Sequence, residues 1–309
     1  MVVTAPMRSI ALAGASLTRA RRCRATRASQ KAVGLHLGLR PTCKRTAFSG
    51  TIDIRVFSGG TRTRVGMHDE SMSLALPSSW VQSHRPIRAA ADGLWSAMAE
   101  ADAGARYDGR AKAYDRVVGN AAYNRLVWGA RTADYRRFAA EAVAAGEGPL
   151  LDAGCGSCVF TAAAYVATTR PVLLVDRSIG MLAAARDRLA WLNGGTPPPN
   201  CTFLQADLLD LPLRPAAFGA GLCMGMLHLF DDPAAVLARL APLRAPGGRL
   251  FATSLVTDRA VGRAMLRALH RRGEVATPRD AATTLNAARQ AFGDVAWIER
   301  RGSMAYVRA

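Results

Sequence analysis

A seven-residue run near the middle of the chain, Asp152-Ala-Gly-Cys-Gly-Ser-Cys158, constrains the fold more than any other feature. It follows the apolar pair Leu150-Leu151 and precedes Val159-Phe-Thr-Ala-Ala-Ala, a segment that we expect to be helical. Glycines let the backbone turn sharply and let a ligand approach the main chain closely. A strand that ends in such a turn and leads into a helix predicts a nucleotide-binding loop.

The segments that follow narrow the class of nucleotide. Residues 172–176 and 203–207 each form a short apolar run that ends in an acid, Asp176 or Asp207. An acid at the tip of the second strand binds ribose hydroxyls. A dinucleotide fingerprint has a third glycine three positions after the second, and here Val159 occupies that position. The pattern therefore argues against a dinucleotide.

The order of these segments resembles that of the class I S-adenosylmethionine-dependent methyltransferases, and in particular the small-molecule branch that includes the ubiquinone and menaquinone biosynthesis type. The likeness covers about residues 104 to 256. Five motifs occur in the family's order: DAGCG at 152–156, VDRSIGMLAAAR at 175–186, LQADLLDLPL at 204–213, FGAGLCMGMLHLFDDP at 218–233 and LAPLRAPGGRLF at 240–251.

The resemblance implies an α/β fold: a doubly wound, mostly parallel, seven-stranded sheet with a motif core at residues 148–256 and an N-terminal helical lid. It implies an enzyme that transfers a methyl group from S-adenosyl-L-methionine to an oxygen, nitrogen or carbon of a small molecule. The alternatives are an NAD-linked oxidoreductase and a non-catalytic cofactor-binding protein of the same fold. The acceptor and the oligomeric state are left open.

The resemblance also assigns cofactor contacts. The loop would surround the methionine part, Asp176 would bind the ribose, Met181 would pack near the adenine, and Asp207 would meet the adenine amino group. Asp152 would either order the loop or attract the ammonium group, and Asp176 has the alternative role of a helix N-cap. The implied set is Asp152, Gly154, Cys155, Gly156, Asp176, Arg177, Met181, Asp207, Leu208 and Met224.

Two candidate residues concern the acceptor. His228 follows the fourth strand of the core, where it is either a general base for a hydroxyl nucleophile or a structural residue bonded to the backbone. Tyr114 belongs to helices that we expect to cover the site, where it either lines the acceptor pocket or packs the helix. The helices at 104–145 and the segment 224–230 would shape this pocket.

The sequence departs from the family pattern at two positions. Cys158 stands where the loop's third glycine is usual, and Gly219 stands where an acid is usual after Phe218. Cys155 and Cys158 also have the spacing of a redox dithiol, and a helix N-terminus would depress a thiol pKa there. No thioredoxin-like pattern surrounds them, so we predict neither a redox nor a metal site.

Periodicity predicts the remaining elements. Helices are expected at 104–118, about 132–145, 158–168, 179–193, 233–243, 258–272 and 280–292, alternating with strands in the motif core. Alternation of this kind implies parallel pairing. Residues 294–299 and 303–307 are predicted to form a final antiparallel hairpin around Arg301-Gly302.

Charge is distributed unevenly along the chain. Residues 1–97 hold 15 Lys and Arg against 4 Asp and Glu, whereas residues 98–309 hold 26 against 19. A net charge of +18 is compatible with a nucleic acid or a membrane surface as partner. Over half of the excess lies in residues 1–97, where no helix or strand periodicity occurs. We predict no nucleic-acid partner and, with no apolar run of 18 residues, no transmembrane segment.

We therefore predict a basic extension over residues 1–97 and a methyltransferase domain over residues 98–309. The extension has the composition of an organelle transit peptide or of a disordered tail. A third alternative is translation from a start codon upstream of the natural one, which would be Met98 or Met67. The last two alternatives are favoured and predict a cytoplasmic protein, and the six cysteines form no disulfide scaffold.

Overall fold

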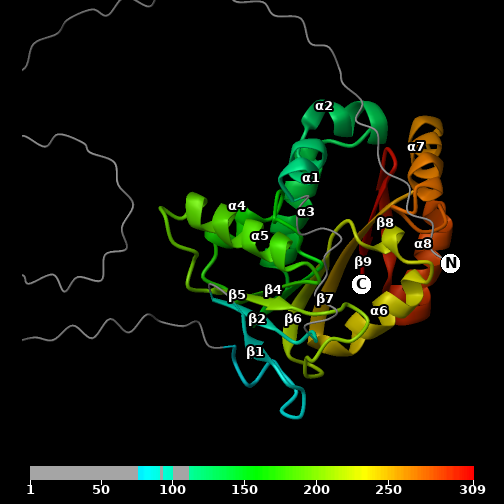
Figure 1. The fold of residues 1–309 in the computed structure, drawn as a ribbon. Helices are drawn as coiled ribbons and strands as arrows, with labels where there is room; N and C mark the ends of the chain where they lie inside the picture. The colour runs from blue at the N-terminus through cyan, green and yellow to red at the C-terminus, as the bar shows by residue number, and fades with distance from the viewer. Residues whose placement is uncertain (1–75, 91–92, 100–110) are drawn as a thin grey trace, which may run out of the picture. The chain divides into compact units, whose positions relative to one another are not determined.

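The computed structural model describes residues 76–90, 93–99 and 111–309, all of which belong to one compact unit, Met67–Ala309. Within these residues one sheet has the strand order β1-β2-β5-β4-β3-β6-β7-β9-β8 (Figure 1). Its strands are β1 (Arg88–Ala89), β2 (Leu94–Ser96), β3 (Leu150–Ala153), β4 (Val172–Asp176), β5 (Cys201–Gln205), β6 (Phe218–Cys223), β7 (Arg244–Leu255), β8 (Trp297–Arg301) and β9 (Met304–Arg308).

The sheet is mixed but mostly parallel. Strands β5, β4, β3, β6 and β7 are parallel neighbours, and β9 pairs antiparallel with both β7 and β8. β3 through β6 are almost continuous apolar runs because helices cover both of their faces. The predicted doubly wound α/β sheet and the final hairpin are confirmed.

Helices cover the two faces of the sheet (Figure 1). Leu182 and Leu189 pack with Leu174 on one face, whereas Val236 and Leu237 pack with Val175 on the other. The helices are α1 (Ala111–Val118), α2 (Ala121–Tyr123), the π-helix η3 (Asn124–Trp128), α3 (Thr132–Ala144), α4 (Ala162–Val166), α5 (Ile179–Leu192), α6 (Pro233–Leu240), α7 (Ala260–Arg271), α8 (Ala281–Phe292) and the 3-10 turns η4 (Leu227–Leu229), η5 (Ala241–Leu243) and η6 (Gly293–Val295).

Two of the predicted helices differ in extent from those that the structure describes. The helix expected at 158–168 begins only at Ala162, because turns occupy the residues between the loop and Thr161. Of the helix expected at 104–118, the structure describes α1 from Ala111 onward, and residues 104–110 lie outside the described part. The helical lid therefore stays a prediction.

The sheet extends beyond the seven predicted strands on the side of β5. β2 pairs parallel with β5, and β1 pairs antiparallel with β2. Trp80 is 7% exposed and its ring centroid lies 6.0 Å from that of Phe218. The predicted domain boundary at residue 98 therefore does not hold for residues 76–90 and 93–97, which belong to the same compact unit as the sheet. Residues 1–75, 91 and 92 lie outside the described part of the chain.

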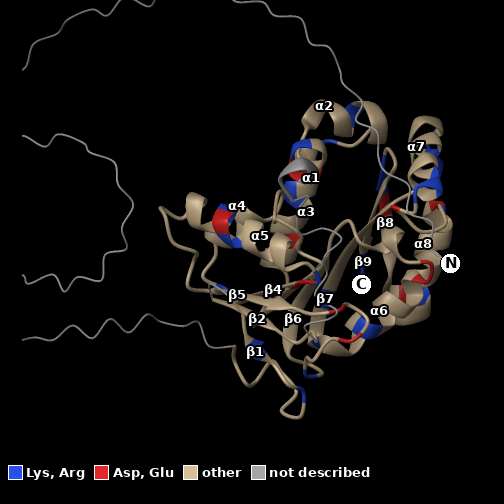
Figure 2. Cartoon of the chain, in the orientation of Figure 1, with Lys and Arg blue, Asp and Glu red and all other residues tan. Residues whose placement is uncertain are grey.

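Several of the Lys and Arg positions of the chain lie along α7, where they recur as blue segments of the helix (Figure 2). Arg263, Arg267 and Arg271 of this helix are exposed and recur every four residues. A stripe of this kind is typical of the solvated face of an amphipathic helix. Among the described residues, every helix is too short or too polar to cross a bilayer.

Candidate functional site

The carboxyl ends of β3, β4 and β5 lie side by side at one edge of the sheet. In the parallel register, Ala153 pairs with Val175 and Asp176 pairs with Gln205. The loop after β3, Asp176 and Asp207 therefore lie at the same edge of the sheet, where ligands bind in open α/β sheets. The structure brings together the groups that the sequence motifs predicted there.

The glycine loop folds back onto β4. The amides of Gly154 and Cys155 donate hydrogen bonds to the Val175 carbonyl at 2.8 and 2.9 Å. Gly154 has φ +80°, and a Cβ added there would lie 2.6 to 2.8 Å from side-chain atoms of Met226. At Gly156, with φ +52°, an added Cβ would meet only open space. Gly156 thus leaves its main chain open at this edge, whereas the Met226 side chain covers Gly154.

Asp176 joins the loop to the next helix. Its Oδ2 accepts a hydrogen bond from the Gly156 amide at 2.8 Å, and its Oδ1 accepts one from the Ser178 amide at 2.9 Å. The N-cap of α5 is Ser178, whose hydroxyl accepts from the Met181 amide at 3.2 Å. The alternative role of Asp176 as N-cap therefore belongs to Ser178.

Asp207 belongs to a second set of contacts at the end of β5. Its Oδ2 lies 3.0 Å from the guanidinium of Arg177, and its Oδ1 accepts from the Leu209 amide at 2.9 Å. The neighbouring Asp210 instead pairs with Arg85 on the surface, at 2.5 Å. Of the two acids in this loop, Asp207 is therefore the one that contacts the residue directly after β4. Two predicted apolar contacts, Met181 and Leu208, are each 5% exposed.

Asp152 is buried, with 1% exposure, at the end of β3. The Tyr165 hydroxyl donates to its Oδ2 at 2.6 Å, while its Oδ1 has no hydrogen-bond partner among the described residues. Burial raises the pKa of Asp152 to about 7, the charge of Asp176 adds to this, and the Tyr165 bond opposes it. An unpartnered buried carboxylate oxygen fits the cationic ammonium of S-adenosylmethionine.

The two loop cysteines do not resemble a redox dithiol. Both are free and buried, and Cys158 has φ +56°. Burial raises the pKa of the Cys155 thiol well above its usual value, whereas a redox cysteine needs a lowered one. The helix that would lower it begins four residues after Cys158, at Ala162. The geometry agrees with a structural role in the loop.

Of the two residues predicted to act on the acceptor, His228 and Tyr114, the structure describes only the side chain of His228. The His228 Nδ1 accepts a hydrogen bond from the Leu255 amide at 3.3 Å, and burial and Arg279 lower the pKa of His228 to about 4. The neutral ring therefore carries its proton on Nε2, which favours the structural role over the general base. The side chain of Tyr114 lies outside the described part of the chain.

A cluster that the sequence analysis missed joins α1 and α5 to the loop. Asp115 accepts hydrogen bonds from the Ser157 hydroxyl and from Arg188. Arg188 also donates from Nε to the Ser157 carbonyl, at 2.8 Å. These three residues are far apart in sequence and follow no motif, so only the fold brings them together.

A cavity of about 320 Å³ lies between the turn η4 and the segment that follows α7. The turn η4 contributes Leu229 to its wall, and the end of α7 with the segment between α7 and α8 supplies most of the rest. The Leu229 amide bonds to the carbonyl of Met226, the residue that contacts Gly154. The lining residues are Leu229, Asp231, His270, Gly273, Glu274, Val275 and Ala276.

Comparison with known proteins agrees with this geometry. Residues 150–248 match a family model described as a methyltransferase domain. A curated relative, an uncharacterized protein of Synechococcus sp., is 36% identical over 121 residues, which cover 38% of this chain and 27% of that protein. The chain thus spans about a quarter of the length of that relative.

Two solved structures illustrate the likeness of fold. A phosphoethanolamine N-methyltransferase 2 of Haemonchus contortus, in complex with S-adenosyl-L-methionine, is 18% identical with a TM-score of 0.48, and the match covers 62% of this chain and 43% of that one. A geranyl diphosphate C-methyltransferase of Streptomyces coelicolor A3(2) is 13% identical with a TM-score of 0.44, over 57% and 75%. On the family model, residues 150–248 of the chain correspond to a methyltransferase domain.

Proposed function

We propose that the chain transfers a methyl group from S-adenosylmethionine to an oxygen, nitrogen or carbon of a small molecule. The observation that carries the proposal is the meeting of the glycine loop, Asp176 and Asp207 at the ends of three adjacent parallel strands. The open main chain at Gly156 and the unpartnered oxygen of Asp152 support it further.

Each part of the site has a role in holding the donor. When bound, S-adenosylmethionine supplies a methyl group on a sulfonium, which is a good leaving group. Asp152 would attract the ammonium, Asp176 would bind the ribose hydroxyls and Asp207 would meet the adenine. Fixing donor and acceptor in line and excluding water supplies much of the rate in such a transfer, so no strong base is required.

The acceptor would bind beside η4. The cavity of about 320 Å³ next to η4 has room for a small molecule, and its wall joins Leu229 to polar groups at the end of α7. His228 would help to shape this region through its bond to β7. Tyr114 remains our candidate for a lining residue from the lid.

The first test is isothermal titration of the full chain with S-adenosylmethionine, S-adenosylhomocysteine and NAD. We expect micromolar binding of the first two and none of NAD. Asp176→Ala should weaken binding by roughly tenfold or more, since a hydrogen bond to a charged group contributes about 1.5–3 kcal/mol. Asp187→Ala, at an acid of α5 that is 71% exposed, is the matched control and should bind as the unchanged chain does.

The alternatives predict other results. Binding of NAD in place of the adenosyl compounds would show an oxidoreductase. Binding of both adenosyl compounds without transfer to any acceptor in a broad screen would favour a non-catalytic binder. If neither adenosyl compound binds, the proposal is wrong.

A further inference from the structure

We propose that Tyr165 is a positioning residue of the cofactor site: its hydroxyl holds one oxygen of Asp152 and leaves the other oxygen for the cofactor's ammonium. The inference rests on the proposed function and extends it to a residue outside every motif of the chain. Tyr165 lies on α4, thirteen residues after Asp152.

Both partners are fixed in the interior. Tyr165 is 0% exposed and packs in a cluster with Leu150, Leu174 and Leu182. Its hydroxyl lies 2.6 Å from Asp152 Oδ2. Since a carboxylate in apolar surroundings is stable only with hydrogen-bond partners, this bond decides which oxygen of Asp152 is already satisfied.

The second carboxylate oxygen of Asp152 lacks the hydrogen-bond partner that a buried oxygen normally has. Oδ1 of Asp152 is buried and has no hydrogen-bond partner among the described residues, although buried polar atoms in folded proteins almost always have one. The described ion pairs give Asp152 no Lys, Arg or His either. Asp152 stands two residues before Gly154, so a cation held by the loop would satisfy both the oxygen and its charge.

The neighbouring titratable groups supply no positive charge. Besides Tyr165 of α4, they are Asp176 at the end of β4, Cys155 in the loop and Cys223 of β6. Burial raises the pKa of both thiols well above the usual value, so they stay neutral at pH 7. Burial likewise raises the pKa of Tyr165, so its hydroxyl remains a donor. A cationic ligand is therefore the missing partner of Asp152.

The arrangement makes cofactor binding depend on pH. Burial raises the pKa of Asp152 to about 7, so part of the protein carries a neutral Asp152 at that pH. Binding of an ammonium favours the carboxylate, and the proton passes to solvent. Affinity should therefore rise with pH through about 7. The Tyr165 bond lowers the pKa of Asp152, so its loss should move this rise to higher pH.

The experiment is titration calorimetry of the full chain with S-adenosylhomocysteine from pH 5.5 to 8.5, in buffers of different ionisation enthalpy. The unchanged chain should bind more tightly as pH rises and should release protons. Tyr165→Phe should bind about tenfold more weakly at pH 7, and the increase of its affinity with pH should occur at higher pH. Asp152→Asn should bind weakly, and its affinity should not increase with pH through about 7. Comparing variants at equal pH cancels the titration of the ligand's own amine.

Tyr135→Phe is the matched control. Tyr135 is 3% exposed and its hydroxyl has no hydrogen-bond partner among the described residues, so this variant loses a hydroxyl but no bond. It should bind as the unchanged chain does. Tyr165→Phe with unchanged affinity, or with weaker binding and an unchanged pH profile, would overturn the inference while leaving the proposed function intact. No binding by the unchanged chain at any pH would instead overturn the proposed function, and the role of Tyr165 with it.

Discussion

Cys158 replaces the usual glycine of the loop in a backbone conformation that is strained for a residue with a Cβ. Its φ of +56° lies in the left-handed region, which explains why glycine is usual at this position of the loop. A residue with a Cβ loses about 1–2 kcal/mol in that conformation. The buried thiol, 2% exposed, packs against the core and offsets part of the strain.

The strain can be measured by comparing two variants that both lose the sulfur. We expect Cys158→Gly to be more stable than Cys158→Ala by about 1 kcal/mol, because only alanine keeps the strained Cβ. Urea unfolding of the full chain gives the difference. At Cys201, on strand β5, the order should reverse, since glycine in a strand is less stable than alanine. The same order at both positions would contradict the strain argument.

At the scale of elements, β1 and β2 extend the sheet past β5. The Ala97 amide donates to the Gln205 carbonyl at 2.9 Å, and the Ser96 hydroxyl donates to the Gln205 side chain at 2.8 Å. Trp80 and Leu94, at 7% and 3% exposure, are buried from this same segment. Through these contacts, residues 76–90 and 93–97 belong to the folded domain.

A chain that starts at Met98 should therefore be less stable than one that starts at Met67. Burial of one large apolar side chain contributes about 1.5–3 kcal/mol, so losing Trp80 and Leu94 should lower the melting temperature by roughly 10 °C. Removing residues 1–66 leaves every described element intact and serves as the control. Equal melting temperatures for the two truncated chains, measured by circular dichroism, would show that β1 and β2 contribute nothing.

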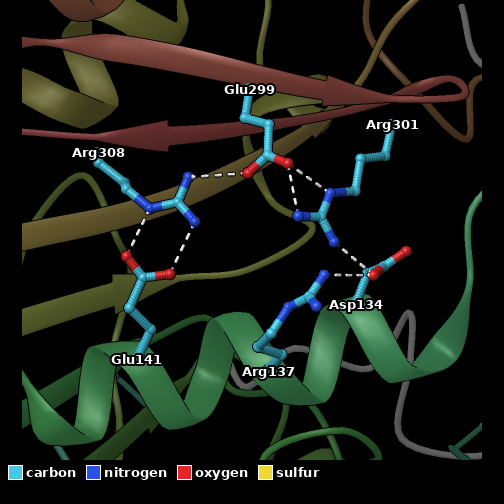
Figure 3. A network of polar contacts seen from close by, with 6 residues as sticks. All are labelled: Asp134, Arg137, Glu141, Glu299, Arg301 and Arg308. Atoms are coloured by element: carbon cyan, nitrogen blue, oxygen red, sulfur yellow. Dashed lines mark hydrogen bonds and ion pairs between the residues drawn. The ribbon is translucent and has the colours of Figure 1, made fainter.

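At the scale of the whole molecule, an ion-pair network joins α3 to the hairpin of β8 and β9 (Figure 3). Arg308 makes two parallel bonds of 2.7 Å to Glu141, and its guanidinium lies 4.7 and 4.5 Å from the ring centroids of Phe138 and Trp297. Arg301 pairs with both Asp134 and Glu299. The network holds the last two strands of the chain against the helix that precedes β3.

Arg308→Lys should destabilise the fold by about 1–2 kcal/mol, because lysine keeps the charge but makes neither the paired bonds nor the ring contacts. The free energy of unfolding in urea measures this loss. Arg137→Lys is the matched control, since Arg137 is 63% exposed and pairs only with Asp134 in the drawn network; it should change stability by less than about 0.5 kcal/mol. Comparable effects of the two changes would contradict the special role of Arg308.

The sequence by itself determined the order of helices and strands, the parallel core and the residues at the carboxyl edge. Short stretches of sequence encode those features: apolar runs, turn glycines such as Gly154, and acids such as Asp176 that end a strand. Secondary structure follows such short-range patterns closely, so the helices from α3 to α8 were predicted to within a few residues, apart from the shorter α4.

Only the tertiary structure decided the contacts between segments far apart in the chain. Gly219, where the family usually has an acid, has no room for a side chain: an added Cβ would lie 1.4 Å from the Glu147 carbonyl oxygen. The bond of Tyr165 to Asp152, the packing of Met226 on Gly154 and the added strand β2 are of the same kind. Such contacts depend on how packed layers meet, and they leave no periodic signal in the residues that make them.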